Sequence, residues 1–434
     1  MNIRRWVAIG LVCALTACGG GGGANSGNAT TPGPQLGAFT MGPAYAYTGN
    51  HPGSVALSGA VVVSAIAANG MQISLVNLAG NTVAQGVGVV TGPTGLGTLG
   101  VSTSLDISSL PAGDYAVRVQ ATSANGGTSN VVSQAFRLVA YPWRSLTPMP
   151  STLSEFAAAA VGSKAYVLTG LSTVNGVGTA TDAVQVYDTV TGNWTTGPQA
   201  PRARAGATAA VVGTRIYLMG GYNGTNPSGV LQVDILDTQT GLWSSGPDAP
   251  TARFYSCAAA IGSQIYLVDG TQTAAEVPAT PALERLDTTT GTWAALAPAS
   301  FPVSNPACTT LNGKMYVTGG ETKAGDFSEL IASQWYDPAI NLWATTNFFA
   351  YNRSRHGSVA VGGRVFLLGG RSDAGGVEAP TDQTEVFDPT TNSWVRRAAM
   401  PAPARDVRAV VAADGLVYVF APTASYVYDA ASEP

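Results

Sequence analysis

The sequence predicts an all-β protein in which a β-sandwich precedes a propeller of six four-stranded blades. Three observations support this. A seven-residue segment that begins with aspartate and ends with tryptophan occurs five times, starting at Asp188, Asp237, Asp287, Asp337 and Asp388. Its tryptophans lie 49 to 51 residues apart, a period typical of radial repeats of short strands. Charged residues make up only 11% of the chain, and its 53 glycines suit many strands joined by tight turns.

Each of these segments is predicted to be a hairpin turn. The residue two positions before the tryptophan is always glycine or asparagine: Gly192, Gly241, Gly291, Asn341 or Asn392. These two residue types adopt a positive φ most readily, which tight hairpins require. About nineteen residues after each tryptophan comes a second turn, and an alternating apolar strand such as IYLMGG or VFLLGG follows it. Each repeat therefore supplies the strands of one blade.

Paired glycines, then an aromatic residue or leucine before aspartate, then tryptophan resemble the kelch repeat over residues 142–434. The resemblance implies a six-bladed kelch propeller similar to the central domain of galactose oxidase. Five blades end at a tryptophan, and the sixth has only three strands, at about 408 to 429. Trp143 has no aspartate turn before it. We expect its strand to complete the sixth blade, which would pair the two ends of the propeller and remove an exposed sheet edge.

The first 35 residues predict an export signal and a tether. Residues 1–17 carry two arginines and an apolar run shorter than the ~20 residues that span a bilayer, which indicates a signal peptide. Leu15 to Cys18 resemble a bacterial lipobox, which implies that Cys18 is lipidated; an ordinary signal peptide is the alternative. Residues 18–35 are a Gly-rich flexible tether. With Gly19 after the cysteine, the resemblance implies an outer-membrane lipoprotein that faces the periplasm or the cell surface.

Residues 36–141 alternate between apolar and polar side chains, as in the short strands of an immunoglobulin-like β-sandwich. The segment from Leu110 to Tyr115 resembles the tyrosine corner that leads into the sixth strand of such domains. The region has no cysteine pair, so we expect no antibody-type disulfide. A spacer and a binding domain both fit this pattern, and we favour the spacer because a fold alone supplies no site.

One face of the propeller is predicted to carry the functional site. Long loops at 171–182, 271–282 and 371–384 open on that face, whereas the opposite face has only tight turns. Counting back from the strand-one turns places arginines around the channel mouth, with further polar residues beside them. The candidate ligand-binding residues are Arg204, Arg253, Arg353, Arg405, Arg355, Arg408 and Tyr255. The guanidinium fork suits an anionic ligand, but the same arginines could instead belong to the repeat and brace the blades.

Cys257 and Cys308 occupy equivalent positions in adjacent innermost strands. A disulfide is compatible with an oxidising periplasm. The other blades have small residues at this position, and side chains related by symmetry point the same way around a ring. We therefore favour packing in limited space over a bond between the two sulfurs.

The composition also bears on cofactors and partners. The copper site of galactose oxidase needs two histidines, and this chain has only His51, outside the propeller, and His356. We expect no metal and no cofactor. The formal charge of −4 argues against nucleic acid as a partner.

These observations predict a monomeric, membrane-anchored binding lipoprotein that recognises an anionic glycan or a protein at the propeller mouth. Only the lipid would contact the membrane. The alternative is an enzyme similar to the sialic acid mutarotases, a mutarotase or epimerase acting on an anionic sugar. Glu155 and His356 would then be its acid and base candidates.

Overall fold

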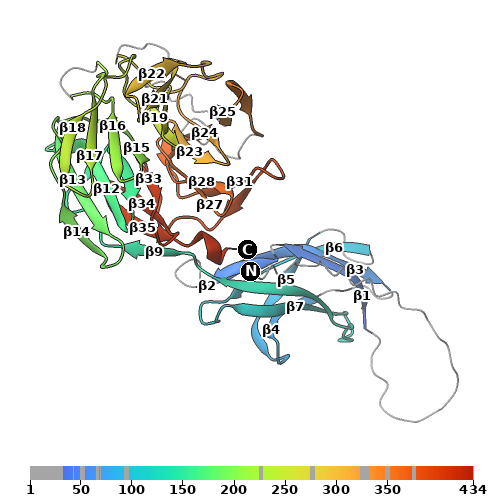
Figure 1. Cartoon of the computed structure of the whole chain (residues 1–434). Coiled ribbons are helices and arrows are strands. Elements are labelled where there is room, and N and C mark those ends of the chain that lie inside the picture. The colour runs from blue at the N-terminus through green and yellow to red at the C-terminus, as the bar shows by residue number, and fades with distance from the viewer. Residues whose placement is uncertain are drawn as a thin grey trace, which may run out of the picture. The chain divides into compact units, whose positions relative to one another are not determined.

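The computed structural model describes residues 33–433 except 43, 49–53, 65–67, 69, 92–96, 224–227, 274–278, 323–332, 348–351 and 374–377. The predicted signal peptide, the lipidation site Cys18 and most of the tether lie outside the described residues. None of the helices within them is long and apolar enough to span a membrane. The chain divides into two compact units (Figure 1). One comprises residues up to 42, 56–105 and 116–134, and the other comprises 43–55, 106–115 and 135–434.

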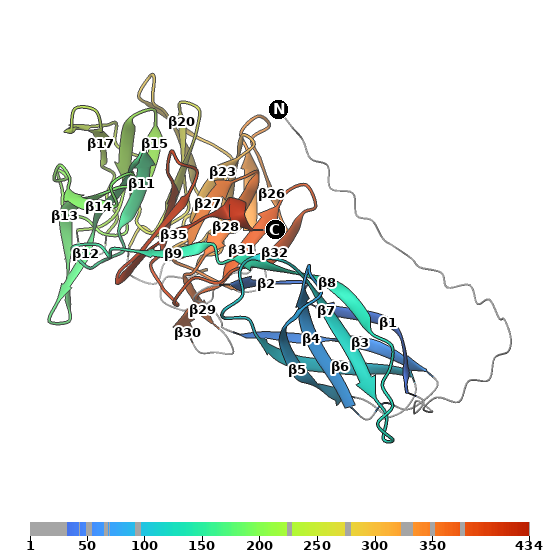
Figure 2. The ribbon, with the colours of Figure 1, turned by 90° about the horizontal axis from the view of Figure 1, so that it is seen from below.

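The described strands that precede residue 142 form one curled sheet of eight strands (Figure 2). Their sheet order is β1-β3-β6-β5-β4-β7-β8-β2, and β2 runs parallel to β8. The consecutive strands β1 and β2 thus form its two opposite edges, so the sheet curls over an apolar core. The strands are β1 (Gln35–Gly42), β2 (Tyr45–Thr48), β3 (Ser54–Ser64), β4 (Gly70–Asn77), β5 (Thr82–Thr91), β6 (Gly97–Asp106), β7 (Gly113–Thr122) and β8 (Val132–Ala140).

The predicted alternation and tyrosine corner are both present in this sheet. On β7, Tyr115, Val117 and Val119 are buried, whereas the residues between them are partly exposed. The Tyr115 hydroxyl donates to the carbonyl of Pro111 at 2.9 Å, four residues earlier. This bond fixes the entry to β7, as it does in immunoglobulin-like sandwiches.

The remaining described strands form the propeller, whose six sheets have four strands or more (Figure 1). In each sheet the strands run in order from the central channel outward. Blade 1 comprises β10 (Leu153–Ser154), β11 (Ala157–Val161), β12 (Lys164–Val174), β13 (Val177–Asp188) and β14 (Asn193–Thr196). Blade 2 comprises β15 (Thr208–Val212), β16 (Arg215–Met219), β17 (Val233–Asp237) and β18 (Leu242–Ser245). Blade 3 comprises β19 (Cys257–Ile261), β20 (Gln264–Val268), β21 (Leu283–Asp287) and β22 (Thr292–Ala295).

The last three blades follow the same plan. Blade 4 comprises β23 (Ala307–Leu311), β24 (Lys314–Thr318), β25 (Ser333–Asp337) and β26 (Leu342–Thr345). Blade 5 comprises β27 (Gly357–Val361), β28 (Arg364–Leu368), β31 (Thr384–Asp388) and β32 (Ser393–Arg397), with a hairpin of β29 (Arg371–Asp373) and β30 (Glu378–Pro380) between its second and third strands. Blade 6 comprises β33 (Arg408–Val411), β34 (Val417–Ala421), β35 (Ala424–Tyr428) and β9 (Trp143–Leu146), and a short helix η1 (Ala430–Ser432) follows.

The ring closes as predicted. Strand β9 pairs antiparallel with β35, with Trp143 opposite Tyr428. The two rings lie 4.6 Å apart between centroids in the buried core of blade 6. The N-terminal strand of the propeller therefore completes its C-terminal blade.

A tryptophan in every blade also bonds to the chain that leaves the preceding blade. Each indole N–H donates to a backbone carbonyl at 2.8–3.1 Å. The pairs are Trp143–Ala398, Trp194–Thr147, Trp243–Pro198, Trp293–Pro247, Trp343–Ala297 and Trp394–Asn347. Because the first pair joins blade 6 to blade 5, the bonds run around the whole ring, and each satisfies an indole N–H that packs between blades.

The aspartate that opens each hairpin holds the turn. The carboxylate of Asp287, for example, accepts from the hydroxyl and the amide of Thr289, and these bonds lower its pKa to about 2. Gly291 and Asn341 have the predicted positive φ of 71° and 53°. The repeated segment is thus a hairpin turn, as expected.

Candidate functional site

A ring of six equivalent residues surrounds the channel mouth, one from each blade. All have a positive φ of 53–63°, which only glycine adopts without strain. From the second to the fifth member, the amide of each donates to the carbonyl of the member before it at 2.8–3.1 Å. The members are Glu155, Gly206, Tyr255, Asn305, Arg355 and Asp406. We call them the mouth ring. Strained residues held by such bonds are typical of functional sites.

Arg355 lies at the centre of the charges in the mouth ring. Its guanidinium contacts carboxylates from three other blades: Glu155 at 3.5 Å, Glu321 at 3.4 Å and Asp406 at 3.2 Å. Burial alone would lower the pKa of Arg355, but these carboxylates raise it, so the group stays charged. Arg371 extends the network, contacting Glu321 at 2.9 Å and Glu378 at 2.7 Å.

Two tyrosines occupy the space above the only glycine among the ring's six members. A Cβ on Gly206 would lie 2.9 Å from the ring of Tyr255 and 3.3 Å from that of Tyr222. The Tyr222 hydroxyl donates to Oε2 of Glu155 at 2.6 Å, and the Tyr255 ring lies 5.2 Å from the guanidinium carbon of Arg355. Tyr255, a predicted ligand residue, therefore supports Arg355 and is not among the residues that line the cleft described next.

A cleft of about 710 Å³ opens on this face above blade 6. Strands β34 and β35 are joined there by only Pro422 and Thr423. The neighbouring connections are longer: β12 and β13 of blade 1 have 11 and 12 residues, against five in the corresponding strands of the other blades, and blade 5 adds the β29–β30 hairpin (Figure 2). The cleft thus lies between two raised hairpins. Its charged lining is three arginines and three acids: Arg355, Arg371, Arg405, Glu155, Glu378 and Asp406.

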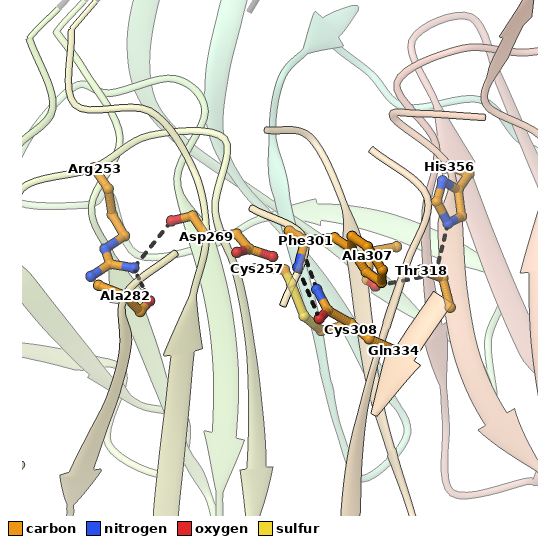
Figure 3. The surroundings of a disulfide bond; sticks show 10 residues. All are labelled: Arg253, Cys257, Asp269, Ala282, Phe301, Ala307, Cys308, Thr318, Gln334 and His356. Atoms are coloured by element: carbon orange, nitrogen blue, oxygen red, sulfur yellow. Dashed lines mark hydrogen bonds between the residues drawn. A yellow bond between two sulfur atoms is a disulfide. The ribbon is translucent and has the colours of Figure 1, made fainter. Parts of the chain in front are cut away.

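The structure removes three predicted arginines from this site. Arg204, Arg253 and Arg353 are at most 1% exposed. Each donates to two backbone carbonyls of its own blade and pairs with a carboxylate on the third strand. The carboxylates belong to Asp234, Glu284 and Glu385. For Arg253 the two carbonyls are those of Asp269 at 3.1 Å and Ala282 at 2.9 Å (Figure 3). A buried, paired guanidinium cannot reach a ligand in the cleft, so these arginines brace their blades.

Arg405 is not equivalent to those three. The three buried arginines each lie two residues before the mouth-ring member of their blade. The residue at that position is Ala404 in blade 6 and Val303 in blade 4. In blades 4 and 6, counting back from the strand-one turn gave a residue one position too late in the sequence. The reason is that the blade 4 turn begins at Asn312 and the blade 6 turn is longer. Arg405 is exposed and lines the cleft. It therefore remains a candidate, on different grounds.

His356 and Arg408 lie along the central channel and do not line the cleft. His356 is 1% exposed, and its Nε2 bonds to the hydroxyl of Thr318 at 2.9 Å (Figure 3). Burial, with the nearby charges of Arg353 and Arg408, lowers the pKa of His356 well below its ordinary value. This buried, neutral imidazole is not placed to be an acid or base in the cleft, whereas Glu155 is.

Cys257 and Cys308 form a disulfide between β19 and β23, which corrects the expectation of simple packing (Figure 3). Their Cα atoms are 5.6 Å apart, within the range that a disulfide spans. Cys257 is the first residue of β19, whereas Cys308 is the second residue of β23, so the two positions differ by one residue. Successive side chains of a strand point to opposite faces, so this offset lets the two side chains of neighbouring strands face each other. Among the described residues, no group of histidine, cysteine and acidic side chains could hold a metal ion.

The fold and its repeated turns define a kelch-repeat β-propeller protein. Residues 155–306 match the model of the KLHDC2/KLHL20/DRC7 kelch-repeats domain, and residues 352–401 match the kelch motif. The chain is similar to the Kelch-like protein terF of Aspergillus terreus, 38% identical over 102 residues, which cover 23% of this chain and 22% of that protein. The solved structure titled "Structure of YjhT" aligns with 65% of this chain and 95% of its own, with a TM-score of 0.55 and 14% identity. At that identity the likeness shows the fold alone.

Proposed function

We propose that this protein binds a glycan in the cleft above blade 6. The observation that carries the proposal is the balanced lining of the cleft, three guanidinium groups and three carboxylates around about 710 Å³. Such a lining offers donors and acceptors together, as a ligand with many hydroxyl groups requires, and the volume is in the usual range for ligand sites. Ion pairs already hold Arg355 and Arg371 in place, so binding does not have to order them.

Arg405 would select an anionic sugar. Its side chain is exposed in the cleft, and the structure gives it no ion pair among the described residues. Arg355 and Arg371, by contrast, already contact carboxylates. An uncommitted guanidinium is the group that best matches a sugar carboxylate.

The test is calorimetric titration with sialic acid, glucuronic acid and glucose. We expect an acidic sugar to bind more tightly than glucose, and Arg405→Ala to weaken that binding about tenfold, the lower end for a hydrogen bond to a charged group because the site is open. Arg215→Ala is the matched control, since Arg215 is an exposed arginine that pairs with Asp237 at 3.6 Å outside the cleft. Equal binding by both variants, or binding of a protein but of no sugar, would refute the proposal.

A mutarotase is the second candidate, and Glu155 favours it. Its side chain is 12% exposed where it lines the cleft, and one carboxylate oxygen is fixed by Tyr222. A positioned carboxylate beside a sugar can move the proton that anomer exchange requires. Wild-type protein should then speed exchange between the anomers of a bound sugar, and Glu155→Gln should abolish this while binding persists. Anomer exchange at the uncatalysed rate would exclude the mutarotase and leave glycan binding as the proposed function.

We further propose that the protein is an outer-membrane lipoprotein, attached through Cys18. The support is the lipobox-like sequence of Leu15 to Cys18 before a Gly-rich segment. Cys18→Ser should release the protein into the soluble fraction or leave an unprocessed precursor. An N-terminal peptide of the wild-type protein that carries no acyl group in mass spectrometry would contradict this.

A further inference from the structure

The central channel beneath the mouth ring is narrow and lined mostly by small side chains. Its volume is about 90 Å³. The first residue of the innermost strand is small in five blades: Ala157, Thr208, Cys257, Ala307 and Gly357. Blade 6 differs, because its innermost strand β33 begins with Arg408. Blade 6 therefore places a long charged side chain where the corresponding residue of the other five blades is small.

The charge of Arg408 has no carboxylate beside it in the channel. Among the described residues that line the channel there is no aspartate or glutamate. The hydrogen bond that the structure gives the guanidinium is to the carbonyl of Val407, at 2.9 Å. The nearest acids by electrostatic influence, Asp406 and Glu155, belong to the mouth ring and contact Arg355. Burial lowers the pKa of Arg408 and Arg355 adds to that effect, whereas Asp406 and Glu155 oppose it only in part. A partly buried cation with no carboxylate beside it loses hydration that no ion pair replaces.

His356, which also lines the channel, does not add a second cation. The Thr318 hydroxyl donates its proton to the carbonyl of Ala307 at 3.2 Å, so Nε2 of His356 must be the donor to that hydroxyl. Nδ1 then carries no proton in the neutral ring. Arg408 is thus the one charged group among the described lining residues.

We propose that the channel is a binding site for one small monovalent anion, of the size of chloride, nitrate or formate, held beside Arg408. An anion there supplies the partner that the guanidinium lacks and accepts its remaining N–H groups. A cavity of about 90 Å³ has room for such an ion, since a water molecule needs only about 10–15 Å³ of cavity volume, but it is smaller than the ~150 Å³ that hold a benzene ring and so excludes a sugar ring. The site is distinct from the cleft and does not depend on the proposed glycan binding.

The experiment is thermal unfolding of the full chain at constant ionic strength, with sodium gluconate replaced stepwise by sodium chloride, bromide or nitrate. Gluconate is the control because it is too large to enter. An ion that binds only the folded state raises its stability with concentration. We expect the melting temperature of the wild type to rise by several degrees and to level off, and Arg408→Met to lose this rise. Arg405→Ala, which changes the cleft, should retain it.

An equal rise in wild type and Arg408→Met would overturn the proposal, as would no rise in the wild type. If Arg408→Met does not fold, crystals of the wild type grown in bromide decide the matter. An anomalous peak beside Arg408 supports the site, and a featureless channel at saturating bromide overturns it.

Discussion

Replacing Arg253 by valine tests the bracing role of the buried arginines. The change removes the guanidinium that donates hydrogen bonds to two backbone carbonyls. It also leaves the carboxylate of Glu284, whose side chain is 6% exposed, without its cation. Breaking a buried ion pair from one side costs about 3–5 kcal/mol. At about 2–4 °C per kcal/mol for a unit of this size, Arg253→Val should lower the melting temperature by roughly 6–20 °C.

Blade 4 supplies the control. It has Val303 where blade 3 has Arg253, and Gln334 where blade 3 has Glu284. Gln334 accepts from the amide of Ser300 at 3.0 Å. It also donates to the carbonyl of Phe301 at 2.9 Å (Figure 3). The double variant Arg253→Val with Glu284→Gln copies this neutral pair and should recover at least half of the lost stability.

A double-mutant cycle in denaturant measures the coupling between the two side chains. We expect a coupling energy of about 2 kcal/mol or more, because the residues share one buried network. Single variants that each cost under about 1 kcal/mol and simply add would refute the bracing argument.

Three further predictions follow from the fold. A chain that begins at residue 152 lacks β9 and exposes the edge of β35, so it should aggregate or melt below a chain that begins at residue 136; equal melting temperatures would mean that the blades close in another way. Reduction of Cys257–Cys308, 51 residues apart, should lower the free energy of unfolding by about 4 kcal/mol by the loop-entropy relation, and an unchanged denaturation midpoint with both thiols titratable would contradict this. The pKa of His356 in the folded protein lies well below its ordinary value of 6.5. As pH drops below about 6.5, the unfolded chain therefore binds a proton that the folded chain does not, and the free energy of unfolding should fall. His356→Gln should flatten the stability profile between about pH 6.5 and 5, and a profile that keeps its slope would assign the loss to other groups.

The architecture could be predicted because its determinants are local and repeated. An aspartate, a residue with positive φ and a tryptophan form the hairpin by themselves, and Trp143 revealed the closing strand by its isolation. The role of the buried arginines also had a signal in the sequence. Arginine occurs in the three blades that carry an acid three residues before the hairpin aspartate, whereas Leu153 and Val303 accompany Gln185 and Gln334 at that position. Comparing the repeats at these two positions would have indicated paired charges inside each blade.

The cleft and the disulfide could not be predicted in the same way. The cleft depends on how far β12 and β13 extend beside the short β34–β35 turn, and hairpin length within a loop leaves little trace in the periodicity. Glu321 and Arg371, which complete the charge network, lie just after the second strands of blades 4 and 5, where no repeat pattern marks them. The disulfide depends on the distance between neighbouring blades near the axis, which is a property of the closed ring.

The central claim is that exposed Arg405 binds ligand while buried Arg253 supports the fold. The most direct test is calorimetric titration of one acidic sugar into three proteins: the wild type, Arg405→Ala, and the double variant Arg253→Val with Glu284→Gln. The account predicts that Arg405→Ala binds about tenfold more weakly without a change in melting temperature, and that the double variant binds as the wild type does. Wild-type affinity in Arg405→Ala together with lost binding in a folded double variant would contradict it.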